Sequence, residues 1–390
     1  MRAYRTELDP NDKQRTALLR HAGAARFAYN FGLRRKIDAY GATGRSPTAI
    51  DLHRELNALK RIEFPWLYET SKCAPQQALR NLDKAFDGFF RRCKTGEKQK
   101  GFPKFKSRKR GIGSFTLTGS IRVTPNSVRL PRLGALRLKE RGYFPTDARV
   151  TAATVSEQAG RWFVSIRTDE PEPRRPIGTE TLGVDVGIKN LAVLSDGIVF
   201  ENPRVLKKAE CRLRHYQRIV ARRVKGSNNR RKAVRRVARL HYRVKCVRND
   251  AIQKATAAIA KRAAVIGVES LNVAGMMRNH HLAGSLSDSA LSEFSRCLQY
   301  KVLWHGGQVI EADRWFPSSK TCSACGTVKQ TLSLSERTFR CGCGLEIDRD
   351  LNAAINLRNL AASSVVTVCG GWDDLVPPAK QEPNAVYPSG

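Results

Sequence analysis

The chain has 390 residues, and its 70 Lys and Arg against 35 Asp and Glu give a formal net charge of +35. This length allows two or three domains, and so large a positive charge repels itself unless a polyanion, most often nucleic acid, is bound. No apolar run reaches the roughly 20 residues of a membrane span, and the N-terminal segment lacks the apolar core of a secretion signal. We therefore expect a cytoplasmic, nucleoid-associated protein without a membrane partner, whose ten cysteines are reduced or bind metal.

The N-terminal half predicts a β domain that is interrupted by helices. Residues 1–10 (MRAYRTELDP) form its first strand, and residues 11–93 carry apolar side chains at helical spacing. Three helices are predicted, at 13–40, 47–62 and 74–93. Short alternating segments between turn residues over 94–175 predict the other strands of a β-barrel-like domain. The helical domain would then be an insertion in this β domain.

The C-terminal half predicts an α/β domain over residues 180–362, after a Pro-rich linker (PEPRRPIGTE). Three strands, a long basic helical hairpin at 203–263, a strand, a helix near 287–305, a strand and a final helix follow one another. This is the element order of the RNase H fold. A cysteine-rich module at 318–346 precedes the final helix, and the Gly/Pro-rich residues 363–390 predict a flexible tail.

Three acidic residues of the α/β domain stand in distinctive local sequences. Asp185 lies in an apolar strand (TLGVDVG), where an unpaired carboxylate is costly. Glu269 ends the strand AAVIGVES, and Asp350 opens the last helix (DRDLNAAINL). An ion pair with Lys189 and a helix cap are the structural alternatives for Asp185 and Asp350. Together the three predict a catalytic cluster that binds two Mg²⁺, or Mn²⁺ in their place, for phosphodiester cleavage.

In these residues the chain resembles the TnpB (OrfB) proteins of bacterial insertion sequences, which are compact relatives of the type V CRISPR effector nucleases. The resemblance extends over nearly the whole chain. It rests on the segments RFAYNFGL, GFPKFKSR, GVDVGIKNLAVLSDG, GVESLNV, DRWFPSSKTCSACG and DRDLNAAINL.

The resemblance implies an RNA-guided DNA endonuclease with an RNase H-like RuvC nuclease domain. Its guide RNA would come from the element's own end, with one or two protein copies on each RNA. The wedge (β) and recognition (helical) domains would read a short motif beside the double-stranded target DNA. The metal ligands would be Asp185, Glu269 and Asp350, with Asp348 in a supporting role.

Four cysteines have the spacing of a structural metal site, as two pairs separated by fifteen residues. The first pair is C-x-x-C, whereas the second is C-x-C and departs from the commoner family pattern. Gly342 and Gly344 can supply the positive φ angles of so tight a loop. Four thiolates suit one tetrahedral Zn²⁺ in a zinc-ribbon-like insertion, and four ordinary reduced thiols are the alternative. The predicted ligands are Cys322, Cys325, Cys341 and Cys343.

Basic stretches in both halves predict contacts with nucleic acid. Residues 204–248 hold eighteen Lys and Arg and one acid, Glu210, which suits a helical pair along the phosphates of a guide–target duplex. In GFPKFKSRKR, Phe102 and Phe105 either stack on bases or belong to the core. The polar side chains of the first helix either read DNA or are solvated. The predicted contacts are Arg26, Tyr29, Asn30, Arg34, Lys104, Phe105, Lys106, Arg108, Arg222, Arg223, Lys225, Arg230, Arg231 and Lys232.

Two other functions are compatible with a transposon-encoded basic protein, namely a strand-joining transposase and a DNA-binding regulator that does not cut. A tyrosine-type transposase needs two histidines around an apolar residue, but His280 and His281 are adjacent. The GVDVGIKN segment and the cysteine module argue against a carboxylate-triad transposase. The three intact acids argue against a regulator that only binds.

Overall fold

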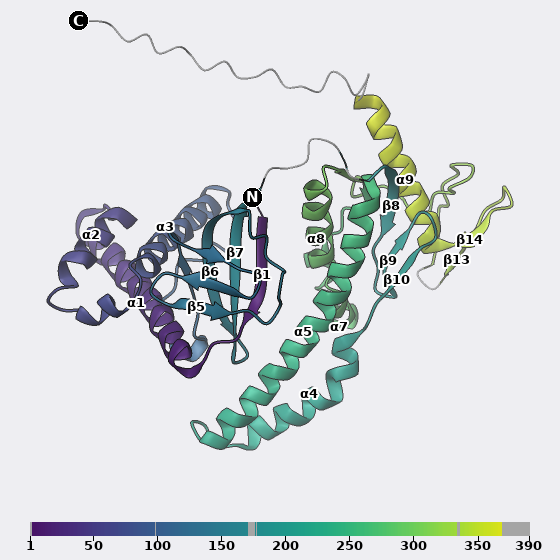
Figure 1. Ribbon diagram of the computed structural model, residues 1–390. Coiled ribbons are helices and arrows are strands. Elements are labelled where there is room, and N and C mark those ends of the chain that lie inside the picture. Colours follow the sequence, from purple (N-terminus) through teal and green to yellow (C-terminus); the bar gives the residue numbers. More distant parts are fainter. Residues whose placement is uncertain (1, 98, 171–175, 177, 334–335, 369–390) are drawn as a thin grey trace, which may run out of the picture. The chain divides into compact units, whose positions relative to one another are not determined.

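The structure is a computed structural model that describes residues 2–97, 99–170, 176, 178–333 and 336–368. The chain is of mixed α/β class, as predicted, and forms two compact units, Met1–Pro171 and Glu172–Gly390 (Figure 1). The linker predicted from its prolines therefore coincides with the boundary between the units, although most of that linker lies outside the described residues. Among the described helices, none combines the length and the apolar character needed to cross a membrane.

The first unit contains two small antiparallel sheets. Its strands are β1 (Arg2–Leu8), β2 (Ser114–Leu117), β3 (Arg122–Val123), β4 (Ser127–Leu130), β5 (Gly134–Arg137), β6 (Arg149–Gln158) and β7 (Arg161–Asp169). One sheet has the order β1-β7-β6-β2 and the other β3-β4-β5, and a bridge between Leu8 and Leu138 connects them. Pairing of β1 with β7 runs from Arg2 opposite Thr168 to Leu8 opposite Trp162. The N-terminal strand thus joins the sheet, as predicted.

Three helices follow β1 in the chain before the other strands begin. They are α1 (Asp12–Thr43), α2 (Ala49–Leu59) and α3 (Cys73–Lys94), and the sequence predicts each to within three residues at its ends. A capping box of Asn11 and Gln14 starts α1. Gly32 allows α1 and α3 to pack closely, because a Cβ there would lie 2.6 Å from the Leu79 side chain.

One buried histidine is built into this helical core. His21 is 1% exposed, its Nδ1 lies 2.8 Å from the Ala17 carbonyl, and its Nε2 accepts the Ser71 backbone N–H at 3.0 Å. These partners fix the neutral tautomer with the proton on Nδ1. Burial lowers the pKa of His21 below its ordinary value of 6.5.

The second unit contains a five-stranded sheet with helices on both faces and a separate two-stranded sheet. Its elements are β8 (Glu180–Asp185), β9 (Asn190–Leu194), β10 (Val199–Glu201), α4 (Val205–Arg222), α5 (Asn228–Arg262), β11 (Ala263–Val268), α6 (Val273–Met276), α7 (His280–Ser289), α8 (Leu291–Trp304), β12 (Gln308–Glu311), β13 (Thr338–Arg340), β14 (Glu346–Asp348) and α9 (Arg349–Val368). The strand order is β10-β9-β8-β11-β12. Strands β8, β11 and β12 are mutually parallel, β9 runs antiparallel to β8, and β10 runs antiparallel to β9. Apolar residues of α5 and α8 cover one face of the sheet, and α9 lies on the other (Figure 1).

Two expectations for this unit are corrected. The helix predicted near 287–305 is divided at Ala290, whose φ of 51° breaks the helix into α7 and α8. The end of α7 carries Asp288, whose carboxylate accepts the backbone N–H groups of Leu206 and Lys207 and so caps the first turn of α4. The tail predicted from residue 363 is helical as far as Val368, because the first glycine pair comes only after that residue. Residues 369–390 lie outside the described part of the chain.

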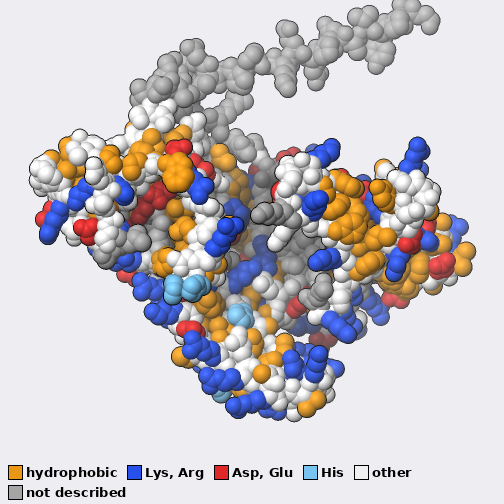
Figure 2. All heavy atoms as spheres, turned by 180° about the vertical axis from the view of Figure 1, so that it is seen from behind, with side chains coloured by type: hydrophobic (Ala, Val, Ile, Leu, Met, Phe, Trp, Pro, Cys, Tyr) orange, Lys and Arg blue, Asp and Glu red, His pale blue; other side chains and the backbone are white. Residues whose placement is uncertain are grey.

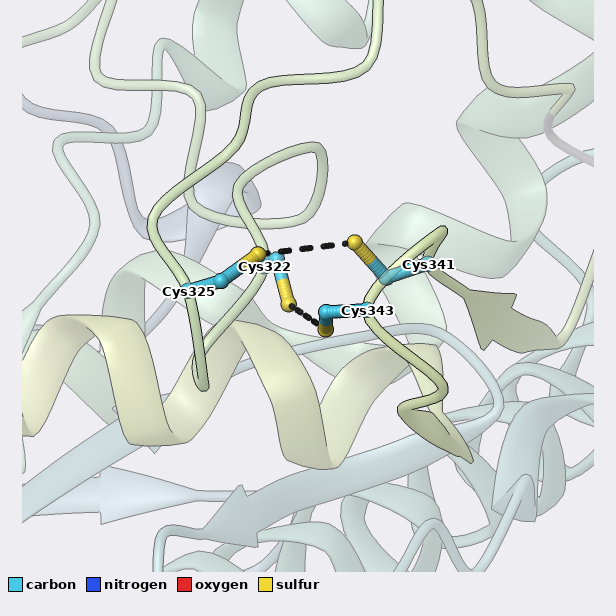
Figure 3. A group of neighbouring side chains, drawn as sticks. All are labelled: Cys322, Cys325, Cys341 and Cys343. Carbon is cyan, nitrogen blue, oxygen red and sulfur yellow. Dashed lines mark hydrogen bonds between the residues drawn. The ribbon is translucent and has the colours of Figure 1, made fainter.

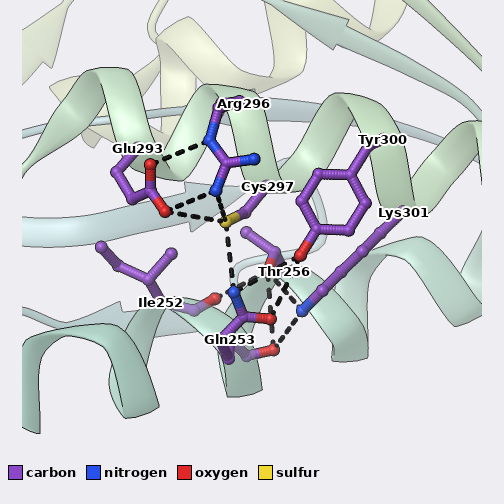
Figure 4. A network of polar contacts seen from close by, with 8 residues as sticks. All are labelled: Ile252, Gln253, Thr256, Glu293, Arg296, Cys297, Tyr300 and Lys301. Carbon is purple, nitrogen blue, oxygen red and sulfur yellow. Dashed lines mark hydrogen bonds and ion pairs between the residues drawn. The ribbon is translucent and has the colours of Figure 1, made fainter. Parts of the chain in front are cut away.

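A polar network attaches α8 to α5 beneath the sheet (Figure 4). The Lys301 ammonium donates to the Gln253 carbonyl at 2.7 Å and to the Thr256 hydroxyl at 2.9 Å. Lys301 is 8% exposed, and burial lowers its pKa. Because both Lys301 bonds join an α8 side chain to α5, they fix the position of α8 on α5.

Candidate active site

The two strand-borne acids lie at the same level on neighbouring strands. In the parallel pairing of β8 with β11, Gly183 lies opposite Gly267 and Val184 opposite Val268. Asp185 and Glu269 come two residues after the paired glycines. Because side chains alternate along a strand, each acid points to the same face as its glycine. The sequence patterns G-V-D and G-V-E therefore place both carboxylates at the carboxyl edge of the sheet, on one face.

Helix α9 covers that face, and Gly183 and Gly267 allow its backbone to lie close to the sheet. A Cβ added to Gly183 would lie 1.8 Å from the Ala354 carbonyl oxygen, and a Cβ added to Gly267 would lie 2.1 Å from that of Leu357. The helix backbone thus rests directly on β8 and β11. Asp350 lies one turn before Ala354, about 6 Å along the helix axis, which matches the roughly 6.6 Å from Gly183 to Asp185 along the strand.

The start of α9 separates the roles of its two acids. The Asp348 carboxylate accepts the backbone N–H groups of Asp350 and Leu351, at 2.9 and 3.2 Å, and so caps the helix. Helix capping was the structural alternative for Asp350, and the structure assigns that task to Asp348. The Asp350 side chain is 17% exposed and pairs with Arg349 at 3.4 Å.

The charges of the other two acids act on Asp185. The pKa of Asp185 is raised well above its ordinary value, first by burial and then by the charges of Glu269 and Asp350. Arg349 is the cation that opposes this shift, so the ion pair with Lys189 that was the alternative for Asp185 is not what balances its charge. Like-charged carboxylates in so enclosed a place favour a bound cation.

A second layer of polar residues holds this cluster, and the sequence analysis missed it. The buried Ser318 hydroxyl donates to the Glu269 carboxylate. Asn356 of α9 donates to the Ser318 carbonyl at 2.8 Å, and Asn352 donates to the Thr321 carbonyl at 2.7 Å. Both asparagines are at most 5% exposed. Their four-residue spacing on one helix face was the available signal.

The same asparagines connect α9 to the cysteine cluster. Asn352 also accepts the Ser323 backbone N–H at 3.0 Å, between the first two cysteines. The Sγ atoms of Cys322, Cys325, Cys341 and Cys343 lie within 4.8 Å of one another. Figure 3 shows the four side chains gathered together. Cys322 and Cys343 are 3.7 Å apart, and Cys325 and Cys341 are 3.6 Å apart. The four predicted ligands therefore converge on one point, where they could hold a metal ion.

Glu269 also lines a hollow of about 260 Å³ beside the carboxylate cluster. Helix α8 contributes Ser292, Ser295 and Gln299 to its polar wall, and β12 contributes Glu311. Gln299 donates to the Glu311 carboxylate at 2.6 Å. Of the three acids, Glu269 is the one that borders this hollow.

The predicted contacts of the first unit gather around the segment 104–108. The Asn30 side-chain amide donates to the Lys106 carbonyl at 2.9 Å and accepts the Lys106 N–H at 2.8 Å, so it holds this segment on α1. The Lys106 ammonium lies 3.8 Å from the ring centroid of Tyr29, which is buried. Lys104 and Arg108 are exposed, whereas Arg26 is partly buried and donates to the Ile112 carbonyl.

The two phenylalanines of this segment differ. Phe105 is 43% exposed, with the Arg34 guanidinium 5.5 Å from its ring centroid, and is open to a ligand. Phe102 packs edge-on against Phe86 and Phe89 of α3, at 5.6 and 5.3 Å between ring centroids. Phe102 thus packs on α3 and is at the same time 46% exposed, so packing and stacking both stay open to it.

The basic hairpin of α4 and α5 presents its cations to solvent. Lys and Arg side chains crowd its surface at the bottom of Figure 2, while Leu213 of α4 and Ala233 and Val244 of α5 are buried. The predicted contacts Arg222, Arg223, Lys225, Arg231 and Lys232 are exposed, and Arg230 is partly buried. Of the eighteen cations in 204–248, only Arg214 and Arg248 form an ion pair with an acid that the structure describes.

Comparison with known proteins agrees with these features. Three protein-family profiles match the chain: one described as "Probable transposase" (OrfB_IS605) over residues 163–280, a Cas12f1-like TNB domain over 292–357, and a helix-turn-helix domain over 1–45. In the structure, residues 1–45 contain β1 and the single helix α1. A protein of Streptomyces pristinaespiralis, provisionally named an RNA-guided DNA endonuclease, is 36% identical over 95% of this chain and 91% of its own length.

The chain belongs to the TnpB (OrfB) family. A second family relative, InsQ of Escherichia coli K12, has the same provisional name and is 33% identical over 98% of this chain and 97% of its own length. Among solved structures, Cas12f1 in a complex with sgRNA and target DNA aligns over 87% of this chain and 82% of its own, with a TM-score of 0.53 and 15% identity. At that identity the likeness concerns the fold, which the TnpB chain shares.

Proposed function

We propose that the chain is an RNA-guided DNA endonuclease that cuts double-stranded DNA at a single RuvC-like site in residues 180–362. The observation that carries the proposal is the convergence of Asp185, Glu269 and Asp350 at one edge of a sheet with the order β10-β9-β8-β11-β12. Three strands followed by two parallel ones is the sheet expected of an RNase H fold. The names of the TnpB relatives support the activity.

The carboxylate cluster fits hard divalent cations. Mg²⁺ prefers oxygen ligands and takes one or two carboxylates with water and substrate phosphate. Burial, and then the charges of Glu269 and Asp350, raise the pKa of Asp185, which supports this proposal because a divalent cation would offset the repulsion. When bound, two such ions would stabilise the attacking and leaving oxygens of phosphodiester hydrolysis. Asp185, Glu269 and Asp350 would hold them.

The chain's other residues keep these ligands in place. Ser318 orients Glu269 through its hydroxyl, and Asp348 caps α9 so that the Asp350 side chain is left for the site. Arg349 pairs with Asp350 and offsets part of the negative charge. Gly183 and Gly267 let α9 approach closely enough for Asp350 to meet the other two acids.

The cysteine cluster fits one structural Zn²⁺. With Zn–S bonds of about 2.3 Å, tetrahedral geometry sets the sulfurs about 3.8 Å apart. The two measured pairs, 3.7 Å for Cys322 with Cys343 and 3.6 Å for Cys325 with Cys341, agree with that spacing. The ion would fix the loop that Asn352 and Asn356 attach to α9. Zinc would therefore act on the active site through the position of this loop.

The nucleic-acid partners would bind the basic surfaces. The exposed cations of the α4–α5 hairpin suit the phosphates of a guide–target duplex. The helical domain (11–93) and the β domain (1–10 and 94–175) would recognise the duplex motif beside the target, with Phe105 and Lys104 exposed for contact. The guide RNA would come from the end of the element, with one or two protein copies per RNA.

The test uses the protein purified with RNA co-expressed from its element, Mg²⁺ and a plasmid library with random sequence beside the target. RNA-dependent double-strand breaks in wild type, lost in Asp185→Ala with DNA binding retained, are the expected result. Asp250→Ala removes an exposed acid of the same unit, paired only with Lys254 in the described structure, and should leave cutting unchanged. Strand joining would indicate a transposase instead, and protection without cutting a regulator.

A further inference from the structure

Trp315 is the most exposed large aromatic side chain in the described part of the chain, at 81%. It lies in the loop between β12 and the cysteine cluster, in the same unit as the carboxylates. Leaving an indole in water is unfavourable, because a side chain of this size gains stability from burial. Single exposed apolar side chains are common on protein surfaces, so the exposure of Trp315 gains meaning only together with its fixed backbone and its place near Glu269.

The loop holds Trp315 in one place. The Asp313 carboxylate accepts the Trp315 backbone N–H at 2.8 Å, and the Asp313 carbonyl accepts the Phe316 N–H at 3.0 Å. The next turn is fixed by a bond from the Ser318 N–H to the Phe316 carbonyl at 2.9 Å. Ser318 is in turn buried and bonded to Asn356 of α9. The exposed ring therefore stands on a supported backbone.

The same loop reaches the carboxylate cluster three residues later. Ser318 donates its hydroxyl to Glu269, and three residues of chain span at most about 10 Å. At about 3.4 Å per nucleotide along one strand of a duplex, that distance covers about three nucleotides. A DNA strand with its scissile phosphate at the carboxylates would thus have a base within reach of Trp315.

We infer that Trp315 is a positioning residue that stacks on a base of the DNA strand being cut, within about three nucleotides of the scissile phosphate. Arg314 supports this role, since its guanidinium lies 5.3 Å from the ring centroid and can pair with a phosphate beside the stacked base. Stacking accepts any base, so the contact would add no sequence preference of its own. The inference rests on the proposed nuclease function.

The test measures single-turnover cutting by the RNA-bound protein with Trp315→Leu, Trp315→Phe and Leu303→Ala. Leu303 is an exposed apolar residue of the same unit, 56% exposed, and serves as the matched control. Trp315→Leu should slow cutting by roughly 5- to 150-fold, whereas Trp315→Phe, which keeps a π face, should stay within a few-fold of wild type. Melting temperatures should be equal in all four proteins, because the ring packs on little protein.

A substrate series identifies the contact as a base. Abasic sites are placed one at a time beside the cut, and one position should slow wild type but not Trp315→Leu, because the stacked base is already unpartnered in the variant. The inference would be overturned if Trp315→Leu cut normally or melted at a lower temperature. It would also be overturned if Trp315→Phe had an equal defect, or if the abasic effects were additive at every position. Failure of the nuclease proposal appears separately, as cutting that survives Asp185→Ala.

Discussion

The contact between α9 and Gly183 offers the sharpest test of how this site is built. A methyl group at residue 183 would meet the Ala354 carbonyl oxygen at 1.8 Å and the Arg358 nitrogen at 2.5 Å. Ordinary van der Waals contact begins at 3.4 Å, so α9 must retreat by about 1.6 Å in Gly183→Ala. Both obstructing atoms belong to helix backbone and cannot rotate away as a side chain would.

This displacement has a cost in stability and a cost in activity. Overpacking of a core costs about 1–3 kcal/mol, and the rigid backbone here puts Gly183→Ala near 3 kcal/mol. For a unit of this size, that lowers the melting temperature by roughly 6–12 °C. Because Asp350 moves with α9, and a displacement of 1 Å can cost about 100-fold in rate, cutting should fall by about that factor.

The assay combines thermal unfolding, followed by circular dichroism, with single-turnover cutting of a matched target at 25 °C. Gly284→Ala in α7 is the control, since its Cβ would meet nothing within 4 Å, and it should be neutral or slightly stabilising. If Gly183→Ala melted and cut like wild type, α9 would not depend on this close approach and the reasoning would be refuted. If Gly183→Ala lost cutting but melted like wild type, the predicted strain would be refuted. The loss of cutting could then not be attributed to a displacement of Asp350 by that strain.

Three further predictions concern the metal, the hairpin and the buried histidine. The purified protein should contain one zinc per chain by elemental analysis. A double Cys322→Ser, Cys325→Ser variant should lack the zinc and cut about 100-fold more slowly. A zinc-free wild type that cuts normally would contradict this prediction. A double Arg231→Ala, Lys232→Ala variant should flatten the slope of log affinity against log salt by about 1.8, whereas an unchanged slope would exclude phosphate contact by the two. Because burial lowers the pKa of His21, the unfolded chain takes up a proton first as pH falls below 6.5. The free energy of unfolding should then drop by up to about 1.4 kcal/mol per pH unit, a slope that His21→Gln should lack in urea titrations at pH 7.5 and 5.5.

Local sequence was sufficient for the order of elements and for the identity of the candidate ligands. The apolar runs around Asp185 and Glu269 predict strands through their length and composition. The spacing of the four cysteines predicts a cluster in the same local way. Helices α1 to α3 follow from periodicity and caps near the chain's start. These features depend on neighbours within a few residues, which is what a single sequence records best.

Long-range contacts decided the roles that the sequence left open. Asn30 looked available for reading bases, but its amide is taken up by the backbone of Lys106, 76 residues away. Phe102 could stack or pack, and it packs on α3 while 46% of it stays exposed. Local pattern could not separate these alternatives, because both side chains have the same neighbours along the chain in either case.

The sequence by itself determined that Asp185, Glu269 and Asp350 are candidates, since each stands in a recognisable frame. Only the tertiary structure decided that their elements come together at one edge of the sheet. Parallel pairing sets Gly183 opposite Gly267, and the absence of side chains there lets α9 settle on the sheet with Asp350 at its edge. The structure also shows that Asp348, and not Asp350, caps α9. Register and helix approach depend on atoms far apart in the chain, so they are fixed by packing and not by any local pattern.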